Sequence, residues 1–310
     1  METSYRGRRE RDFAIIRPEC ALVTATDAKH APYLFNAINS IRERFPAHPT
    51  LYVFDLGMTW LQRRELQSAA GVELRKVDRF VPHWKTNWSW KPYILTQVSE
   101  RYVLYFDAAN IVLYRPLHLW FLTIARSGYF LIKNGQRMQD ITPSNYWAKF
   151  DLDAARSATD STFGAGLFGF DRRSPAGEAV SEALQRTKAG WNLGRSRAEQ
   201  RRTYDASVIH DCLLFRADQT LLNLAFRKRY GDALVLRDEV RYCGRGGRAD
   251  DPRQYLWYSR RLRQSLIYFW RPLRRPMWPY LAGRVVAYAR ILVGDAVRAP
   301  LSWWLRRKAS

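Results

Sequence analysis

Tyr102-Val103-Leu104-Tyr105-Phe106-Asp107-Ala108-Ala109-Asn110 is the stretch of the sequence that decides the fold. Its run of aromatic and β-branched residues predicts a buried strand, because the run is too short for an ordinary helix. The strand stops at Asp107, and two small residues and an Asn follow. Since open α/β sheets bind ligands just outside the carboxyl ends of their strands, we expect Asp107 to face a crevice. The alternative is an Asp that only caps the next segment.

The segments before this strand alternate between extended and helical patterns. Strands are expected at residues 21–27, 51–54 and 72–77, and helices at 30–45, 59–70 and 92–101. This alternation predicts an α/β fold with a mixed, mostly parallel sheet flanked by helices.

Composition limits the class of partner and the compartment. The 310 residues carry a net charge of +22, which predicts attraction to phosphate groups, a lipid surface or nucleic acid. The three cysteines, Cys20, Cys212 and Cys243, form no CxxC pair, so a reducing compartment is expected. No apolar run is long enough to span a bilayer or to form a signal peptide, which favours a cytoplasmic protein.

Charge and aromatic residues divide the chain into three parts. Residues 1–17 are expected to be a disordered basic arm, residues 18–245 the α/β domain, and residues 246–310 a basic aromatic tail. Residues 251–310 contain 13 Lys and Arg against two Asp, together with five Trp. The helical pattern from Leu281 to Pro300 predicts an amphipathic helix that lies on an anionic membrane surface. A core helix packed on the domain and a site for single-stranded nucleic acid are the alternatives.

Two loops could carry binding groups. Three Trp and two Lys lie between Trp84 and Lys91, which suggests a lysine directed at phosphates between aromatic walls, although Trp side chains could simply cover a sheet edge. The Gly-rich segment 161–170 lacks GxGxxG spacing, so it does not meet the dinucleotide fingerprint. Its glycines would let the backbone approach a ligand, or they form a tight turn before a strand at Leu167–Phe170. The Arg-rich stretch 190–206 is expected to be a mobile loop.

A helix is expected to begin near Asp218 and to end near Arg229. At the first turn the helix dipole favours a negative charge, so Asp218 could be a cap or a functional carboxylate.

Four segments, in this order, resemble the GT-A-fold glycosyltransferases, in particular glycosyltransferase family 8 and related bacterial sugar transferases. They are Leu22–Asp27, Trp90-Lys91-Pro92, Val103–Ala109, and the Gly-rich segment followed by Asp218-Gln219. The similarity covers about residues 19–236 and leaves the tail outside. It implies a GT-A fold and the transfer of a sugar from a nucleoside diphosphate, most often UDP, to an acceptor hydroxyl.

The resemblance also assigns roles to individual residues. Asp107 and Asp218 would be the catalytic residues, with Asp218 touching the donor sugar and acting as base if the enzyme inverts. Donor-binding residues would be Thr24, Ala25, Thr26, Asp27, Lys91, Asp107, Ala108, Ala109, Gly164, Gly166 and Gln219. Lys91 would hold the diphosphate, and Gly164 to Gly166 would approach the sugar or the acceptor.

The sequence departs from the family pattern where the metal would bind. Ala109 stands in place of the second Asp of Asp-x-Asp, and no His follows Asp218. Mg²⁺ or Mn²⁺ could still bind through Asp107 and Asn110 with the phosphates of the donor, or Lys91 could neutralise the diphosphate without a metal.

The basic tail indicates an acceptor at a membrane, such as a lipid-linked saccharide or an envelope glycan, and a peripheral location on the inner face. Two other readings remain. The first is a transferase-like protein that only binds glycans or lipids, for which Ala109 is the best argument. The second is a nucleic-acid-binding protein, although no nucleic-acid partner is expected.

Overall fold

The structure is a computed structural model, and it describes residues 2–112, 117–199, 208–237, 243–244 and 256–258. The predicted amphipathic helix of the tail, Leu281–Pro300, lies outside the described residues, as does the domain boundary at 245.

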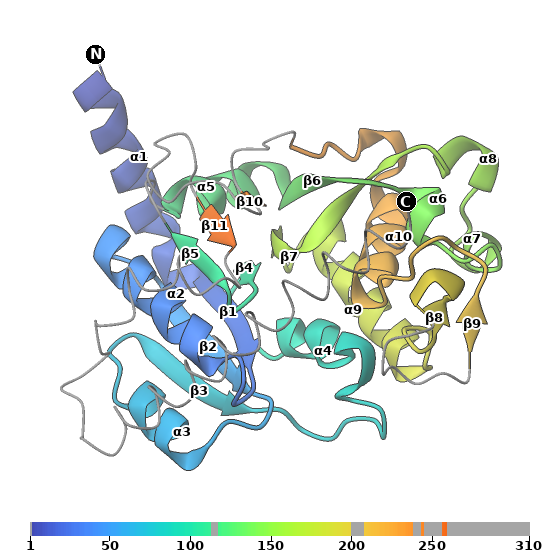
Figure 1. The fold of residues 1–310 in the computed structure, drawn as a ribbon. Coiled ribbons are helices and arrows are strands. Elements are labelled where there is room, and N and C mark those ends of the chain that lie inside the picture. The colour runs from blue at the N-terminus through green and yellow to red at the C-terminus, as the bar shows by residue number, and fades with distance from the viewer. Residues whose placement is uncertain (1, 113–116, 200–207, 238–242, 245–255, 259–310) are drawn as a thin grey trace, which may run out of the picture.

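A six-stranded sheet with the order β3-β2-β1-β4-β7-β6 forms the centre of the molecule (Figure 1). Its first four strands are mutually parallel, while β7 is antiparallel to both β4 and β6. The strands are β1 (Cys20–Thr26), β2 (Thr50–Asp55), β3 (Val72–Lys76), β4 (Tyr102–Phe106), β6 (Tyr129–Arg137) and β7 (Ser161–Asp171). The predicted mixed, mostly parallel sheet is confirmed.

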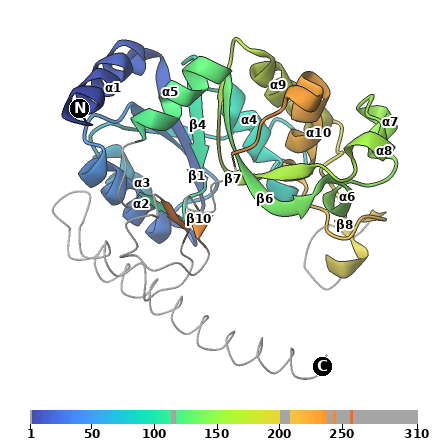
Figure 2. The same cartoon turned by 90° about the horizontal axis from the view of Figure 1, so that it is seen from above.

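Helices cover both faces of this sheet (Figures 1 and 2). One layer contains α1 (Glu2–Ile16), α2 (Ala31–Arg44), α3 (Trp60–Gln67) and α5 (His118–Ser127), and the other contains α4 (Trp90–Thr96), α9 (Pro175–Lys188) and α10 (Asp218–Tyr230). Successive strand residues enter opposite layers: Leu104 packs with the first group of helices and Tyr105 with the second. Every residue of β1 and β4 is therefore buried, as the continuous apolar runs require.

The remaining elements are short. They are β5 (Asn110–Val112), α6 (Met138–Ile141), α7 (Tyr146–Lys149), α8 (Ala154–Ser157), β8 (Arg195–Ser196), β9 (Ile209–His210), β10 (Cys243–Gly244) and β11 (Leu256–Tyr258), with 3-10 turns at Arg17–Glu19, Thr86–Trp88, Arg197–Glu199 and Gly231–Ala233. No helix in the described residues is long and apolar enough to cross a membrane.

The N-terminal segment differs from its prediction. Residues 1–17 were expected to be disordered, but α1 runs from Glu2 to Ile16. Phe13 is buried and lies 5.3 Å from the ring of Phe45 and 5.9 Å from that of Phe121. These contacts of Phe13 hold the helix against the domain, and the Arg-rich composition of residues 1–17 does not predict them.

Three further segments differ from their predicted structure because they pair with strands that are distant in the sequence. The Gly-rich segment is one long strand, β7, held between β4 and β6, and not a turn before a short strand. The stretch 190–206, expected to be a loop, contains β8, which pairs with β9. Within the predicted helical tail, β11 pairs with β5, with Tyr258 opposite Asn110.

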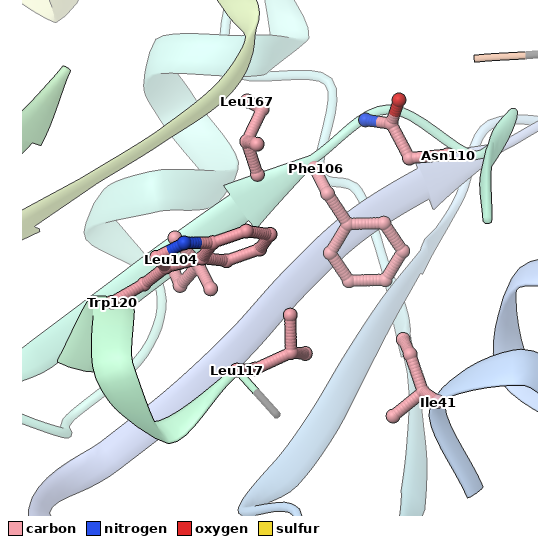
Figure 3. Close-up of a pocket in the computed structure, with 7 residues that line it drawn as sticks. All are labelled: Ile41, Leu104, Phe106, Asn110, Leu117, Trp120 and Leu167. Carbon is pink, nitrogen blue, oxygen red and sulfur yellow. The ribbon is translucent and has the colours of Figure 1, made fainter. Parts of the chain in front are cut away.

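The carboxyl end of β4 is closely packed. A cavity of only about 10 Å³ lies beneath the turn that follows β4, which is room for about one water molecule. Its lining is almost wholly apolar, formed by Ile41, Leu104, Phe106, Asn110, Leu117, Trp120 and Leu167 (Figure 3). The backbone that presents Asp107 therefore rests on a nearly solid base.

The first turn of α9 leaves no room for a side chain at Gly177. A Cβ there would lie 2.2 Å from the backbone oxygen of Arg172, which cannot move without shifting the chain. We expect Gly177→Ala to lower the free energy of unfolding by about 1–3 kcal/mol, measured by urea denaturation. Gly135→Ala is the control, because a Cβ at Gly135 meets nothing within 4 Å, and it should cost less than about 0.5 kcal/mol. Equal losses would contradict the close packing of α9.

Candidate active site

The ammonium group of Lys91 joins four elements at the carboxyl end of β4. Lys91 lies in the first turn of α4, and its Nζ is 2.8 Å from Asp218 Oδ2 at the start of α10. The same Nζ is 3.5 Å from Asp107 Oδ1, which follows β4, and donates to the carbonyl oxygen of Ala165 in β7 at 3.1 Å. The structure thus brings together the three residues on which the sequence prediction rests, and we call them the Lys91 cluster.

Tyr105, near the end of β4, contacts both Asp107 and Lys91. Its hydroxyl donates to Asp107 Oδ1 at 2.7 Å, and Lys91 Nζ lies 4.9 Å from the centre of its ring. The sequence prediction did not include Tyr105 in the site. The signal was present, since residues two apart in a strand point to the same face, and Tyr105 precedes Asp107 by two.

The start of α10 is held in a strained conformation. Ala217, directly before Asp218, has a φ of 42° with a ψ of −105°, a combination that a residue with a Cβ rarely adopts. Hydrogen bonds made by the first two turns of α10 maintain the strain: Thr220 Oγ1 donates to the carbonyl oxygen of Ile141 at 2.9 Å, and Asn223 bonds Phe163 of β7. In the second contact the Asn223 amide both accepts from Phe163 N at 2.8 Å and donates to Phe163 O at 3.0 Å. These bonds fix Asp218 against Lys91.

Burial and charge act in opposite directions on the ion pair. Burial by itself lowers the pKa of Lys91, but the negative charges of Asp107 and Asp218 outweigh it and raise that pKa, so Lys91 stays charged. Burial raises the pKa of Asp218, and the charge of Lys91 offsets only part of this rise. The 2.8 Å contact lacks hydrogen-bond geometry, so Asp218 Oδ2 still has capacity to accept a hydrogen bond.

The two glycines predicted near the donor have different surroundings. A Cβ at Gly166 would lie 3.0 Å from Asp107 Oδ2, which is a tight contact that would push the carboxylate from its position. A Cβ at Gly164 would meet only the Cβ of Asn134, at 3.9 Å, which is ordinary contact. Gly166 also accepts from Asp107 N at 2.8 Å and from Asn110 Nδ2 at 2.9 Å, and these bonds fix the turn after β4.

The end of β1 contributes less than the sequence predicts. The side chains of Thr24, Ala25 and Thr26 are buried, and among these residues only Asp27 has a substantially exposed side chain. Asp27 Oδ1 accepts from His30 N at 2.9 Å and lies 2.7 Å from His30 Nδ1. Burial alone would raise the pKa of Asp27, but the bonds from His30 outweigh it and lower that pKa, so Asp27 stays ionised.

Gln219 belongs to a separate polar chain beside the cluster. Its Nε2 donates to Gln136 Oε1 at 3.3 Å, and Asn134 Nδ2 donates to the same oxygen at 3.2 Å. Thr162 Oγ1 donates to Asn134 Oδ1 at 2.9 Å. Gln136, Asn134 and Thr162 were not predicted as site residues, because nothing local in the sequence indicates that β6 and β7 lie next to α10.

The described residues do not fit a resident divalent cation. Ala108 and Ala109 are buried in the turn and offer no carboxylate, and Asn110, whose Nδ2 donates to the carbonyl oxygen of Gly166, could add only its amide oxygen. No group of three or more His, Cys, Asp or Glu in the described ranges could hold a metal. The two available carboxylates, Asp107 and Asp218, already share the cation of Lys91. A hard dication needs several oxygen ligands, so this donor set is a poor one.

Comparisons with known proteins establish the fold. No family model matches the sequence, and no curated protein is found as a relative. Among solved structures, the bifunctional glycosyltransferase WbbM in its apo form is similar with a TM-score of 0.56 at 13% identity, over 87% of this chain and 51% of WbbM. The chain thus spans about half the length of WbbM.

Two more distant structures are glycosyltransferases too. The galactosyltransferase LgtC, solved with donor and acceptor sugar analogues, gives a TM-score of 0.45 at 14% identity over 77% of this chain and 86% of LgtC. The glycosyltransferase GlyE of Streptococcus pneumoniae gives 0.41 at 16% identity over 67% of this chain and 43% of GlyE, and neither likeness is close enough to add to the argument. The likeness to WbbM and the sheet order together show a GT-A-like glycosyltransferase fold.

We expect Lys91→Met to lower the free energy of unfolding by about 3–5 kcal/mol near neutral pH, because it leaves the Asp218 carboxylate buried without a cation. A buried carboxyl with a raised pKa takes up a proton as the pH falls, so the loss should shrink towards acidic pH and grow towards alkaline pH. Urea unfolding of both proteins at about pH 8 and about pH 5 measures the difference.

The double variant Lys91→Met/Asp218→Asn is the matched control for this experiment. It removes both the cation and the titrating carboxyl, so its loss relative to the parent chain should not deepen as the pH rises. A single variant whose loss is the same at both pH values would contradict the ion pair.

Proposed function

We propose that the chain is a glycosyltransferase that moves a sugar from a nucleoside diphosphate donor, UDP being the expected nucleotide, to a hydroxyl of an acceptor. The observation that carries the proposal is the Lys91 cluster, in which the end of β4, the middle of β7 and the starts of α4 and α10 place one cation and two carboxylates together. It lies at the sheet edge where α/β folds bind ligands, and the fold is that of glycosyltransferases.

Accessibility separates the roles of the two carboxylates. The side chain of Asp107 is 31% exposed, whereas those of Lys91 and Asp218 are 5% and 8% exposed. Asp107 is therefore the group that first meets a ligand, and it can accept hydrogen bonds from hydroxyls of the ribose or of the donor sugar. Lys91 and Asp218 form the inner part of the site.

The reaction breaks the bond between the sugar and the diphosphate and forms a bond from the same carbon to the acceptor oxygen, with loss of the acceptor proton. Lys91 would stabilise the negative charge that develops on the leaving diphosphate. The fixed carboxylates would orient the sugar for attack. In an inverting reaction Asp218, whose raised pKa makes it a stronger base, would take the acceptor proton. A retaining reaction needs no such base.

The experiment for this function is calorimetry of the full chain with UDP and a panel of UDP-sugars, with and without Mn²⁺. We expect binding by the parent chain and at least tenfold weaker binding by Gly166→Ala, whose Cβ would displace the Asp107 carboxylate. Gly135→Ala is the control, because a Cβ at Gly135 meets nothing within 4 Å, and it should bind like the parent chain. No binding of any nucleotide or nucleotide sugar would contradict the proposal and favour a transferase-like protein without activity.

The proposed acceptor is a membrane-associated or envelope glycan, and the chain would work at the inner face of the membrane. The support comes from the sequence, since residues 251–310 carry about half of the net positive charge together with five Trp. Aromatic and basic side chains of this kind bind the interface of anionic bilayers.

We expect the full chain to sediment with vesicles that contain phosphatidylglycerol, and less so at high salt, because the attraction is partly electrostatic. A chain that ends after Tyr258 keeps strand β11 and should stay in the supernatant. Binding to neutral phosphatidylcholine vesicles is the control. If the shortened chain still sediments as strongly as the full chain, the tail is not the membrane-binding segment.

A further inference from the structure

A cleft of about 530 Å³ lies outside the Lys91 cluster, in the segment that follows β3. Its lining residues are Arg79, Phe80, Val81, Pro82, Trp84 and Lys85. The cleft is open to solvent, and all of its lining residues belong to this one segment of the chain. The lining combines two cations with two aromatic rings.

The aromatic walls of the cleft are fixed. Phe80 stacks on Tyr93 of α4, with ring centres 4.2 Å apart and planes 3° from parallel. The hydroxyl of Tyr93 donates to Asp78 Oδ2 at 2.8 Å, which holds this stack in place. Phe80 and Trp84 both pack against the main core. A flat or apolar body entering the cleft would therefore meet surfaces that need no rearrangement.

Both cations are available to a ligand. Arg79 and Lys85 are exposed, and neither has a carboxylate partner within the described part of the chain. Lys85 Nζ lies 4.8 Å from the centre of the Trp84 ring and close over Gly57, where a Cβ would be 3.4 Å away. Guanidinium and ammonium groups are donors only, and phosphate oxygens are the acceptors that suit them best.

The cleft shares a rim with the Lys91 cluster but is separate from it. Gly57, beneath Lys85, accepts from Ala28 N at 3.2 Å, so the cleft adjoins the turn that follows β1. The lining residues of the cleft lie between β3 and α4, whereas the Lys91 cluster gathers at the end of β4. An elongated substrate, or two substrates side by side, could occupy both.

The charge of the Lys91 cluster also favours a second cationic site. The cluster has one cation for two carboxylates, so Lys91 alone leaves part of the charge of a bound diphosphate uncompensated. Arg79 and Lys85 supply positive charge along this segment, and the carboxylate of the neighbouring Asp78 accepts a hydrogen bond from the hydroxyl of Tyr93.

We propose that this cleft is a second anion site that binds a phosphate ester carried on a flat or apolar body. Two substrates of the proposed reaction have this chemistry: the nucleotide of the donor, and the diphosphate of a lipid-linked acceptor. The inference rests on the proposed function only for the identity of the ligand, because a phosphate ester can bind here whether or not sugar transfer occurs.

The test compares binding of UDP and of farnesyl diphosphate, below its aggregation concentration, to full-length variants by calorimetry. Arg79→Gln/Lys85→Gln should weaken binding of one of the two ligands by about tenfold or more, because bonds to charged donors are lost. A loss confined to farnesyl diphosphate identifies the acceptor as the occupant, and a loss confined to UDP identifies the donor. Both outcomes support the site.

The matched control is Arg126→Gln/Arg173→Gln, which removes the same charge from the opposite end of the sheet, at the end of α5 and after β7. If Arg79→Gln/Lys85→Gln weakens neither ligand more than this control does, the affinity comes from the overall charge and the proposal is overturned. Trp84→Leu gives an independent check: it should weaken the ligand identified above and leave inorganic pyrophosphate unaffected. If Trp84→Leu weakens binding of this ligand and of pyrophosphate equally, Trp84 makes no contact with the flat or apolar part of the ligand.

Discussion

A single buried ammonium group holds this site together. Lys91 can stay charged in the interior only because Asp107, Asp218 and the carbonyl of Ala165 surround it, and each comes from a different element. The charge of Lys91 is therefore compensated only when four elements have reached their final positions, namely β4, β7, α4 and α10. Buried pairs of this kind seldom add much stability, but they do penalise incorrect arrangements.

The supports around the cluster explain why its geometry can be maintained. Asn223 fastens α10 to β7 through two hydrogen bonds, and Gly166 leaves space for the carboxylate of Asp107. Ala217 adopts a conformation that would relax if those contacts were absent. The strain at this point is consistent with a helix start positioned for chemistry instead of for stability.

Much of the fold and the centre of the site follow from local sequence patterns. A buried run that ends in Asp107 gives the strand and its edge, and the alternation before it gives the parallel sheet. Contacts between distant segments do not follow: β7 is a strand because β4 and β6 flank it, and α1 is ordered because Phe13 reaches Phe45 and Phe121. Tyr105 could have been predicted from its spacing of two residues from Asp107. Gln136 and Asn134 could not, because their place beside the site depends on contact with Gln219, some 80 residues later.

The pairing of β11 with β5 places the last described strand of the chain beside the turn that follows β4. Tyr258 lies opposite Asn110, three residues after Asp107, so the last described strand of the chain ends beside the Lys91 cluster. A ligand bound by residues after Tyr258 would be tethered close to Asp107, and its effective concentration there would exceed its concentration in bulk solution. Under the proposed function, a weak affinity for the acceptor would then be enough.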